Sequence, residues 1–161
     1  MSNNIPDSFA SVLEAVEAIC AEFDSKDSFR SFGPGRWIRD VNVADDDIQH
    51  VAFLLDAEPP LLAVYVILRL PGAYGCGDSL AKALARANYG LLPGCFEIDL
   101  DTGEARYRSA LNLLSDEIKA PDVAQLLSGA LLMSRTYAPA FQKIVQAGAD
   151  PLQAVDEIEF E

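Results

Sequence analysis

The sequence predicts an α+β domain in which a five-stranded antiparallel sheet packs against helices. Three observations predict this class. Residues 88–113 have the pattern of a β-hairpin, residues 37–70 hold three strand-like runs, and apolar residues recur with helical spacing on either side of these segments. The expected order is helix, three strands, helix, two strands, a long helix and a short one. Strands in sequence with helices packed on them are typical of the α+β class, and we expect one domain over residues 1–161.

The first helix is expected over Ile5–Phe23. Pro6 suits its first turn, and Asp7 and Ser8 can cap its free amide groups. Apolar residues recur at steps of three and four, which predicts one broad stripe facing the core. They are Phe9, Val12, Leu13, Val16, Ile19, Cys20 and Phe23. The following residues, 24–35, are polar and contain glycine, so we expect a loop.

Three strands are expected next, over Trp37–Val43, Ile48–Leu55 and Leu61–Leu70. Residues 45–47 are three consecutive aspartates between the first two strands. Their spacing does not match a calcium-binding loop, which favours a turn over a metal site. Residues 58–60 separate the second and third strands, because proline cannot serve the interior of a ladder.

The third strand is apolar on both faces. One row contains Leu62, Val64, Val66, Leu68 and Leu70, and the other contains Leu61, Ala63, Tyr65 and Ile67. Such a strand is central in its sheet, or its second face meets a partner. Tyr65 and Ile67 are therefore candidate partner-binding residues, with Trp37 in support. Coverage by a helix or loop of the same chain is the alternative.

The hairpin has its turn at Thr102-Gly103 in the simplest interpretation, because glycine accepts the positive φ that a tight turn needs. This register pairs unlike charges on one face and apolar groups on the other. The pairs are Asp99 with Arg106, Glu97 with Arg108, and Ile98 with Tyr107. A three-residue loop with a glycine bulge is the alternative.

The remaining helices are expected over Leu80–Tyr89, from Pro121 to about Gly148, and over Pro151–Ile158. Asp78 and Ser79 can cap the first of these, Gly148 can end the second, and Asp150 can cap the third. The long helix contains Pro139, which is expected to kink or split it near Tyr137.

Composition excludes several classes of function. The net charge of −13 repels phosphate groups, so nucleic acid and anionic membrane are poor partners. The chain has neither a signal peptide pattern nor an apolar run long enough to cross a bilayer. The cysteines Cys20, Cys76 and Cys95 lack the number and spacing of a disulfide framework or a zinc site, which favours the cytosol. We expect no cofactor and no bound metal.

Catalytic residues are not indicated by any motif, so we expect a protein that is not an enzyme. Phosphate-binding glycine patterns are missing from the sequence. The alternative is a small-ligand sensor or a cryptic thiol hydrolase that uses His50, the single histidine, with Cys95. That pair would have to converge in space.

Two stretches resemble the YbjN family, which is described as bacterial sensory-transduction regulators. One is LPGCFEIDLDTGEARYR within residues 88–108, and the other is YAPAFQKIVQAGADPLQAV within residues 137–155. The order of elements is similar to the type III secretion chaperone-like fold. These resemblances imply a small acidic homodimer without enzyme activity, acting as a regulator or chaperone-like adaptor. Secretion chaperones of this fold hold an unfolded stretch of another protein, so the implied partner is a protein.

Overall fold

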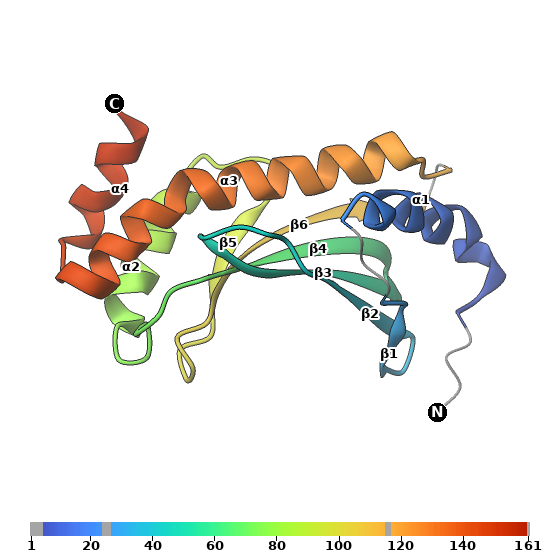
Figure 1. Cartoon of the computed structure of the whole chain (residues 1–161), viewed down its shortest axis with the longest axis horizontal. Helices are drawn as coiled ribbons and strands as arrows, with labels where there is room; N and C mark the ends of the chain where they lie inside the picture. Colours follow the sequence, from blue (N-terminus) through green and yellow to red (C-terminus); the bar gives the residue numbers. More distant parts are fainter. Residues whose placement is uncertain (1–4, 24–26, 115–116, 161) are drawn as a thin grey trace.

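The computed structural model describes residues 5–23, 27–114 and 117–160. An antiparallel sheet of six strands lies against two helices, and two further helices stand at one end of the sheet (Figure 1). The strand order is β1-β2-β3-β4-β6-β5. The strands are β1 (Arg30–Gly33), β2 (Arg36–Val41), β3 (Ile48–Ala57), β4 (Pro60–Leu68), β5 (Cys95–Ile98) and β6 (Ala105–Asn112). The helices are η1 (Asp7–Phe9), α1 (Ala10–Ala21), α2 (Gly77–Asn88), α3 (Ala120–Ala147) and α4 (Pro151–Glu159).

The α+β class with an antiparallel sheet is therefore confirmed, but the sheet has a sixth strand. β1 forms within residues 24–35, where a loop was expected, and it pairs with β2 as an edge strand. Its residues are exposed or half-buried, so hydrophobic patterning gave no signal for it. Gly35 has a φ of 66°, a left-handed conformation that closes the tight connection to β2.

The first helical segment is shorter than expected. A 3₁₀ turn, η1, comes first, and α1 then ends at Ala21. The apolar stripe of the prediction is otherwise confirmed, because Val12, Val16 and Ile19 are buried.

α3 runs through Pro139 as one helix of 28 residues, so the expected split near Tyr137 is wrong. Proline costs a helix interior ~3 kcal/mol through its missing amide and its ring. The helix withstands this because its neighbours Ala138, Ala140 and Phe141 are fully buried against the sheet and the other helices. Gly148 ends the helix with a φ of 63°, as expected.

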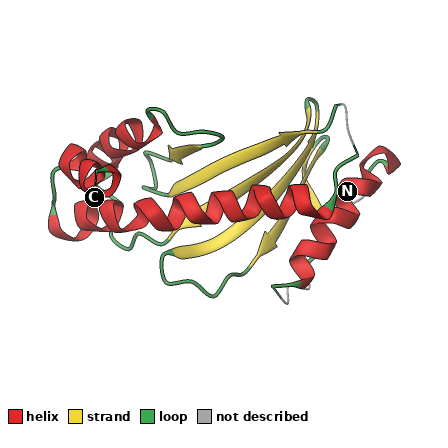
Figure 2. Ribbon diagram, turned by 90° about the horizontal axis from the view of Figure 1, so that it is seen from above, coloured by secondary structure: helices red, strands yellow, loops and turns green. Residues whose placement is uncertain are grey.

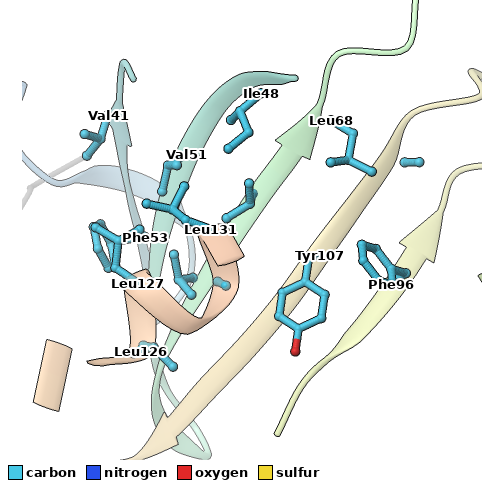
Figure 3. Packing of buried hydrophobic residues seen from close by; sticks show 14 of the residues in the cluster. Val41, Ile48, Val51, Phe53, Leu68, Phe96, Tyr107, Leu126, Leu127 and Leu131 are labelled. Carbon is cyan, nitrogen blue, oxygen red and sulfur yellow. The ribbon is translucent and has the colours of Figure 1, made fainter. Parts of the chain in front are cut away.

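The core lies between α3, α1 and one face of the sheet. α3 lies over one face of the sheet and spans most of its long dimension (Figure 2). Figure 3 shows Leu127 and Leu131 of α3 beside Val51 and Phe53 of β3. Further along, Phe96 of β5 has its ring centroid 5.0 Å from that of Tyr107, 5.3 Å from Tyr137 and 5.1 Å from Phe141.

The hairpin formed by β5 and β6 has a different register from the predicted one. Glu97 lies opposite Arg106, and Phe96 lies opposite Tyr107. This is a slip of two residues, which keeps each side chain on its predicted face. The slip lengthens the loop to 99–104, where the Asp99 backbone amide donates to the Glu104 carbonyl over 2.9 Å. The carboxylate of Asp99 also accepts a hydrogen bond from the Asp101 amide. The side chain of Asp99 therefore stabilises the turn and does not take part in the predicted pair with Arg106.

None of the helices in the described part of the chain is long and apolar enough to cross a membrane.

Candidate functional site

One face of the sheet carries no helix from the described part of the chain. In Figure 1, α1 and α3 lie on one side of the strands, and the other side is uncovered. We call this uncovered side the open face. Because side chains alternate along a strand, Val51, Phe53 and Leu55 of β3 face the helices, whereas the residues between them face outward. The apolar residues of the open face are Phe32, Ile38, Ala52, Leu54, Leu61, Ala63, Tyr65, Ile67 and Ala110.

Tyr65 lies near the centre of the open face, on the central strand β4. Its ring is half-buried, and the guanidinium carbon of Arg106 lies 4.4 Å from the ring centroid. This cation–π contact holds the ring against β6 and leaves part of it accessible. Ile67, two residues further along β4, is 4% exposed and forms the floor beside it.

The apolar surface continues across β3 and β2. Ile38 pairs with Leu54, and both side chains are half-buried. Together with Tyr65 they border a hollow of about 410 Å³. It is lined by Phe32, Arg36, Ile38, Asp40, His50, Ala52, Leu54, Tyr65, Ile67, Glu104 and Arg106.

Ion pairs surround this apolar surface. Glu97 accepts hydrogen bonds from Arg106 over 3.0 Å and from Arg108 over 2.5 Å. Burial opposes ionisation of the Glu97 carboxyl, but the hydrogen bonds from Arg108 and Arg106 outweigh it and lower its pKa. At the opposite end, Arg36 pairs with Asp56 over 2.7 Å. Several charges around the surface are therefore paired, although the chain as a whole carries −13.

Trp37 does not belong to this surface. It lies on β2 opposite Leu55 and faces the helices. Its side chain is 7% exposed, and its ring centroid lies 6.4 Å from that of Phe9. The structure thus brings Tyr65 and Ile67 together but places Trp37 in the core on the other side of the sheet.

His50 and Cys95 are not brought within reach of each other. Both lie on the open face, His50 on β3 and Cys95 on β5, with β4 and β6 between them. Three strand spacings amount to ~14 Å, far beyond a hydrogen bond. His50 lines the hollow, whereas Cys95 has its sulfur 3.5 Å from Arg108. Among the described residues, we find no cluster of His, Cys, Asp and Glu able to hold a metal ion.

Sequence reasoning missed part of this site. It identified the Tyr65 row of β4 but not Leu54, Ile38 or Arg106, which come from neighbouring strands. Their membership follows from pairing between strands, which the alternation within a single strand does not indicate.

The comparisons with known proteins support the fold. A solved structure described as the crystal structure of the ExsC–ExsE complex matches with a TM-score of 0.52 and 14% sequence identity. The match covers 89% of this chain and 100% of the other chain. At this identity the likeness concerns the fold alone, and it confirms the secretion chaperone-like arrangement. No protein-family model and no curated protein matches the chain.

Proposed function

We propose that this chain is a non-enzymatic protein-binding module of the secretion chaperone type. In this proposal the open face holds an extended segment of a partner protein. The observation that carries the proposal is an apolar surface centred on Tyr65 with no helix over it among the described residues. The structural neighbour supports it, since that structure is described as a complex of two proteins.

The shape of the surface favours a polypeptide over a small molecule. Small-molecule sites are usually deep and enclose most of the ligand. Here Tyr65, Leu54 and Ile38 instead extend the apolar surface across three neighbouring strands, as an extended polypeptide would require. A partly exposed tyrosine beside a buried isoleucine is typical of the centre of a protein interface.

The biological role, the cellular location and the oligomeric state of the chain are part of the same proposal. We propose a regulator or chaperone-like adaptor related to the YbjN family that acts in the cytoplasm as a homodimer. The resemblance of residues 88–108 and 137–155 supports this assignment.

The test is a charge placed at the centre of the surface. Tyr65→Asp should abolish retention of partner proteins from a lysate of the source organism. The reason is that a buried carboxylate costs more than the contact contributes. Leu132→Asp is the matched control, because Leu132 is 59% exposed on α3, on the other side of the sheet. Light scattering over a dilution series reports whether each variant keeps the mass of the wild type.

A partner retained by the wild type and by Leu132→Asp but not by Tyr65→Asp supports the proposal. If Tyr65→Asp retains the same partner and has the same mass, the open face is not the binding surface. Cys95→Ala separates the alternative, because a thiol hydrolase depends on this side chain, whereas the hollow proposed to bind a protein does not include it.

A further inference from the structure

Among the described residues, no strand pairs with the outer edge of β6 beyond Arg108. β6 extends to Asn112, but its outer neighbour β5 pairs only as far as Arg108. The Leu113 amide donates to the Pro60 carbonyl on the β4 side over 3.0 Å. Since alternate residues of an antiparallel strand point to opposite neighbours, the backbone groups of Ala110 and Asn112 point outward, away from β4. Both residues are exposed.

The outer edge of β5, in contrast, is closed by a side chain of α2. Asn88 donates from Nδ2 to the Phe96 carbonyl over 2.9 Å and accepts the Phe96 amide over 2.7 Å. This side-chain amide takes the place of a neighbouring strand, which is one way that proteins protect an edge. The strand edge open at this end of the sheet is therefore that of β6.

A cavity of about 220 Å³ lies directly beside the open edge, between β6 and α3. Its lining is mostly apolar and includes Leu111 and Leu126, with Pro93 from the loop before β5. An apolar cavity of about 150 Å³ accepts benzene. This cavity therefore has room for one side chain of the size of leucine, methionine or phenylalanine.

The cavity contains a polar group without a partner. Tyr107 is 1% exposed, and its hydroxyl has no hydrogen-bond acceptor among the described residues. Burial raises the pKa of this phenol, against a smaller opposing effect of the nearby Gly94 amide. That amide is a donor, so the hydroxyl hydrogen still lacks an acceptor. A buried donor that is left unpaired is costly, and a ligand carbonyl would relieve that cost.

We propose that the edge of β6 at residues 109–112 binds an extended segment of another protein as an added strand. Such a strand continues the line of β5 and bonds to the outward backbone groups of Ala110 and Asn112. One of its apolar side chains enters the cavity under α3, where Tyr107 donates to an acceptor of the segment. The cavity lies on the helix-covered side of the sheet, away from Tyr65, so this inference does not depend on the function proposed above.

Charge decides between another protein and a second copy of this chain. The net charge of −13 on each copy disfavours a second copy at this edge, so the homodimer proposed above is expected to use another surface. Asp122, exposed at the mouth of the cavity, adds a local negative charge. The segment is therefore expected to carry lysine or arginine next to its apolar residue.

Gly129 is a position from which a larger side chain can be directed into the cavity. It lines the cavity from α3, and a Cβ at this position meets nothing within 4 Å. Gly129→Leu should therefore occupy the cavity and favour the helix. Gly129→Ala is the control that leaves most of the cavity empty. Ala110→Pro removes the outward amide, and an edge position tolerates proline. Its control, Ala110→Val, keeps that amide.

The experiment is selection of peptides from a random display library on the full chain, with Gly129→Leu protein as the counter-selection. Selected peptides should contain an apolar residue flanked by basic ones. A synthetic copy should bind Gly129→Leu and Ala110→Pro at least about tenfold more weakly than the wild type and both controls. Methylation of the peptide's backbone amides should weaken binding to a similar extent. This measurement tests the backbone hydrogen bonds of the added strand with the wild-type protein, in case Ala110→Pro does not fold. Tyr107→Phe should weaken binding without lowering the midpoint of urea unfolding.

Three results would overturn the inference. The first is a selection that yields no peptide preferring the wild type over Gly129→Leu. The second is a selected peptide that binds Ala110→Pro or its own methylated form as well as before. The third is a concentration-dependent dimer that Gly129→Leu dissociates, since the occupant is then a second copy. Tyr65→Asp should leave peptide binding unchanged, so failure of this site and failure of the open face are distinguishable.

Discussion

Asn88 should stabilise the fold through its two hydrogen bonds to the backbone of Phe96, and Asn88→Ala tests this directly. The substitution removes the partners of the Phe96 backbone amide and carbonyl. This position is buried, since the Phe96 side chain is only 3% exposed. A net contribution of ~0.5–1.5 kcal/mol for each hydrogen bond predicts a loss of about 1–3 kcal/mol in the free energy of unfolding. Helix propensity offsets little of this, because Asn88 is the last residue of α2.

Urea unfolding followed by circular dichroism measures the loss. Asn88→Asp keeps an acceptor for the Phe96 amide but places a carboxylate oxygen against the Phe96 carbonyl. It should therefore destabilise the chain at pH 7 at least as much as alanine does. Asn42→Ala, at an exposed position, is the control and should stay within ~0.5 kcal/mol of the wild type.

Loss of Asn88 should also change association. An uncovered strand edge is a template for pairing with another chain. Light scattering should therefore show a greater increase of mass with concentration for Asn88→Ala than for the wild type. An Asn88→Ala protein as stable as Asn42→Ala, with an unchanged mass, would refute the role of this side chain as an edge cover.

Three further predictions concern the core, the turn and the open face. Phe96→Ala should lower the free energy of unfolding by ~3–5 kcal/mol, because it removes the ring at the centre of three aromatic contacts. The exposed Phe32→Ala should cost less than ~1 kcal/mol in the same urea titration. Gly103→Ala should destabilise more than Gly75→Ala, since both have positive φ but only the Cβ at Gly103 would meet the Ala73 backbone, at 2.7 Å. Glu97→Gln should lose up to ~1 kcal/mol at pH 7, and this difference from the wild type should close as pH falls below 4.5, the ordinary carboxyl value, through the lowered pKa of Glu97.

The hairpin illustrates what periodicity can and cannot predict. Alternation assigned Phe96 and Tyr107 to one face and Glu97 and Arg106 to the other, and the structure has them there. Alternation repeats every two residues, so it cannot distinguish registers that differ by two. The side chain of Asp99 decided the outcome, because its bonds to the loop amides favour the longer turn.

The candidate site was predictable on one strand and not across strands. Tyr65 and Ile67 are adjacent members of a single row, so they remain neighbours in any sheet. Leu54 and Ile38 join them only through pairing with β3 and β2, which is a long-range property. The cavity beside β6 left no signal in the sequence, since it arises where β5 ends and α3 passes over the gap.

Trp37 allows the two faces of the sheet to be distinguished in solution. It is the single tryptophan of the chain, and it lies against Phe9 on the helix-covered side. A partner that binds on Tyr65 contacts the opposite side, so the emission maximum of Trp37 should not move during a titration with the partner identified by the Tyr65→Asp test. The sequence had grouped Trp37 with Tyr65 in one binding surface. A red shift at saturation would mean that α1 leaves the sheet and exposes the indole, and the binding surface would then include the covered face.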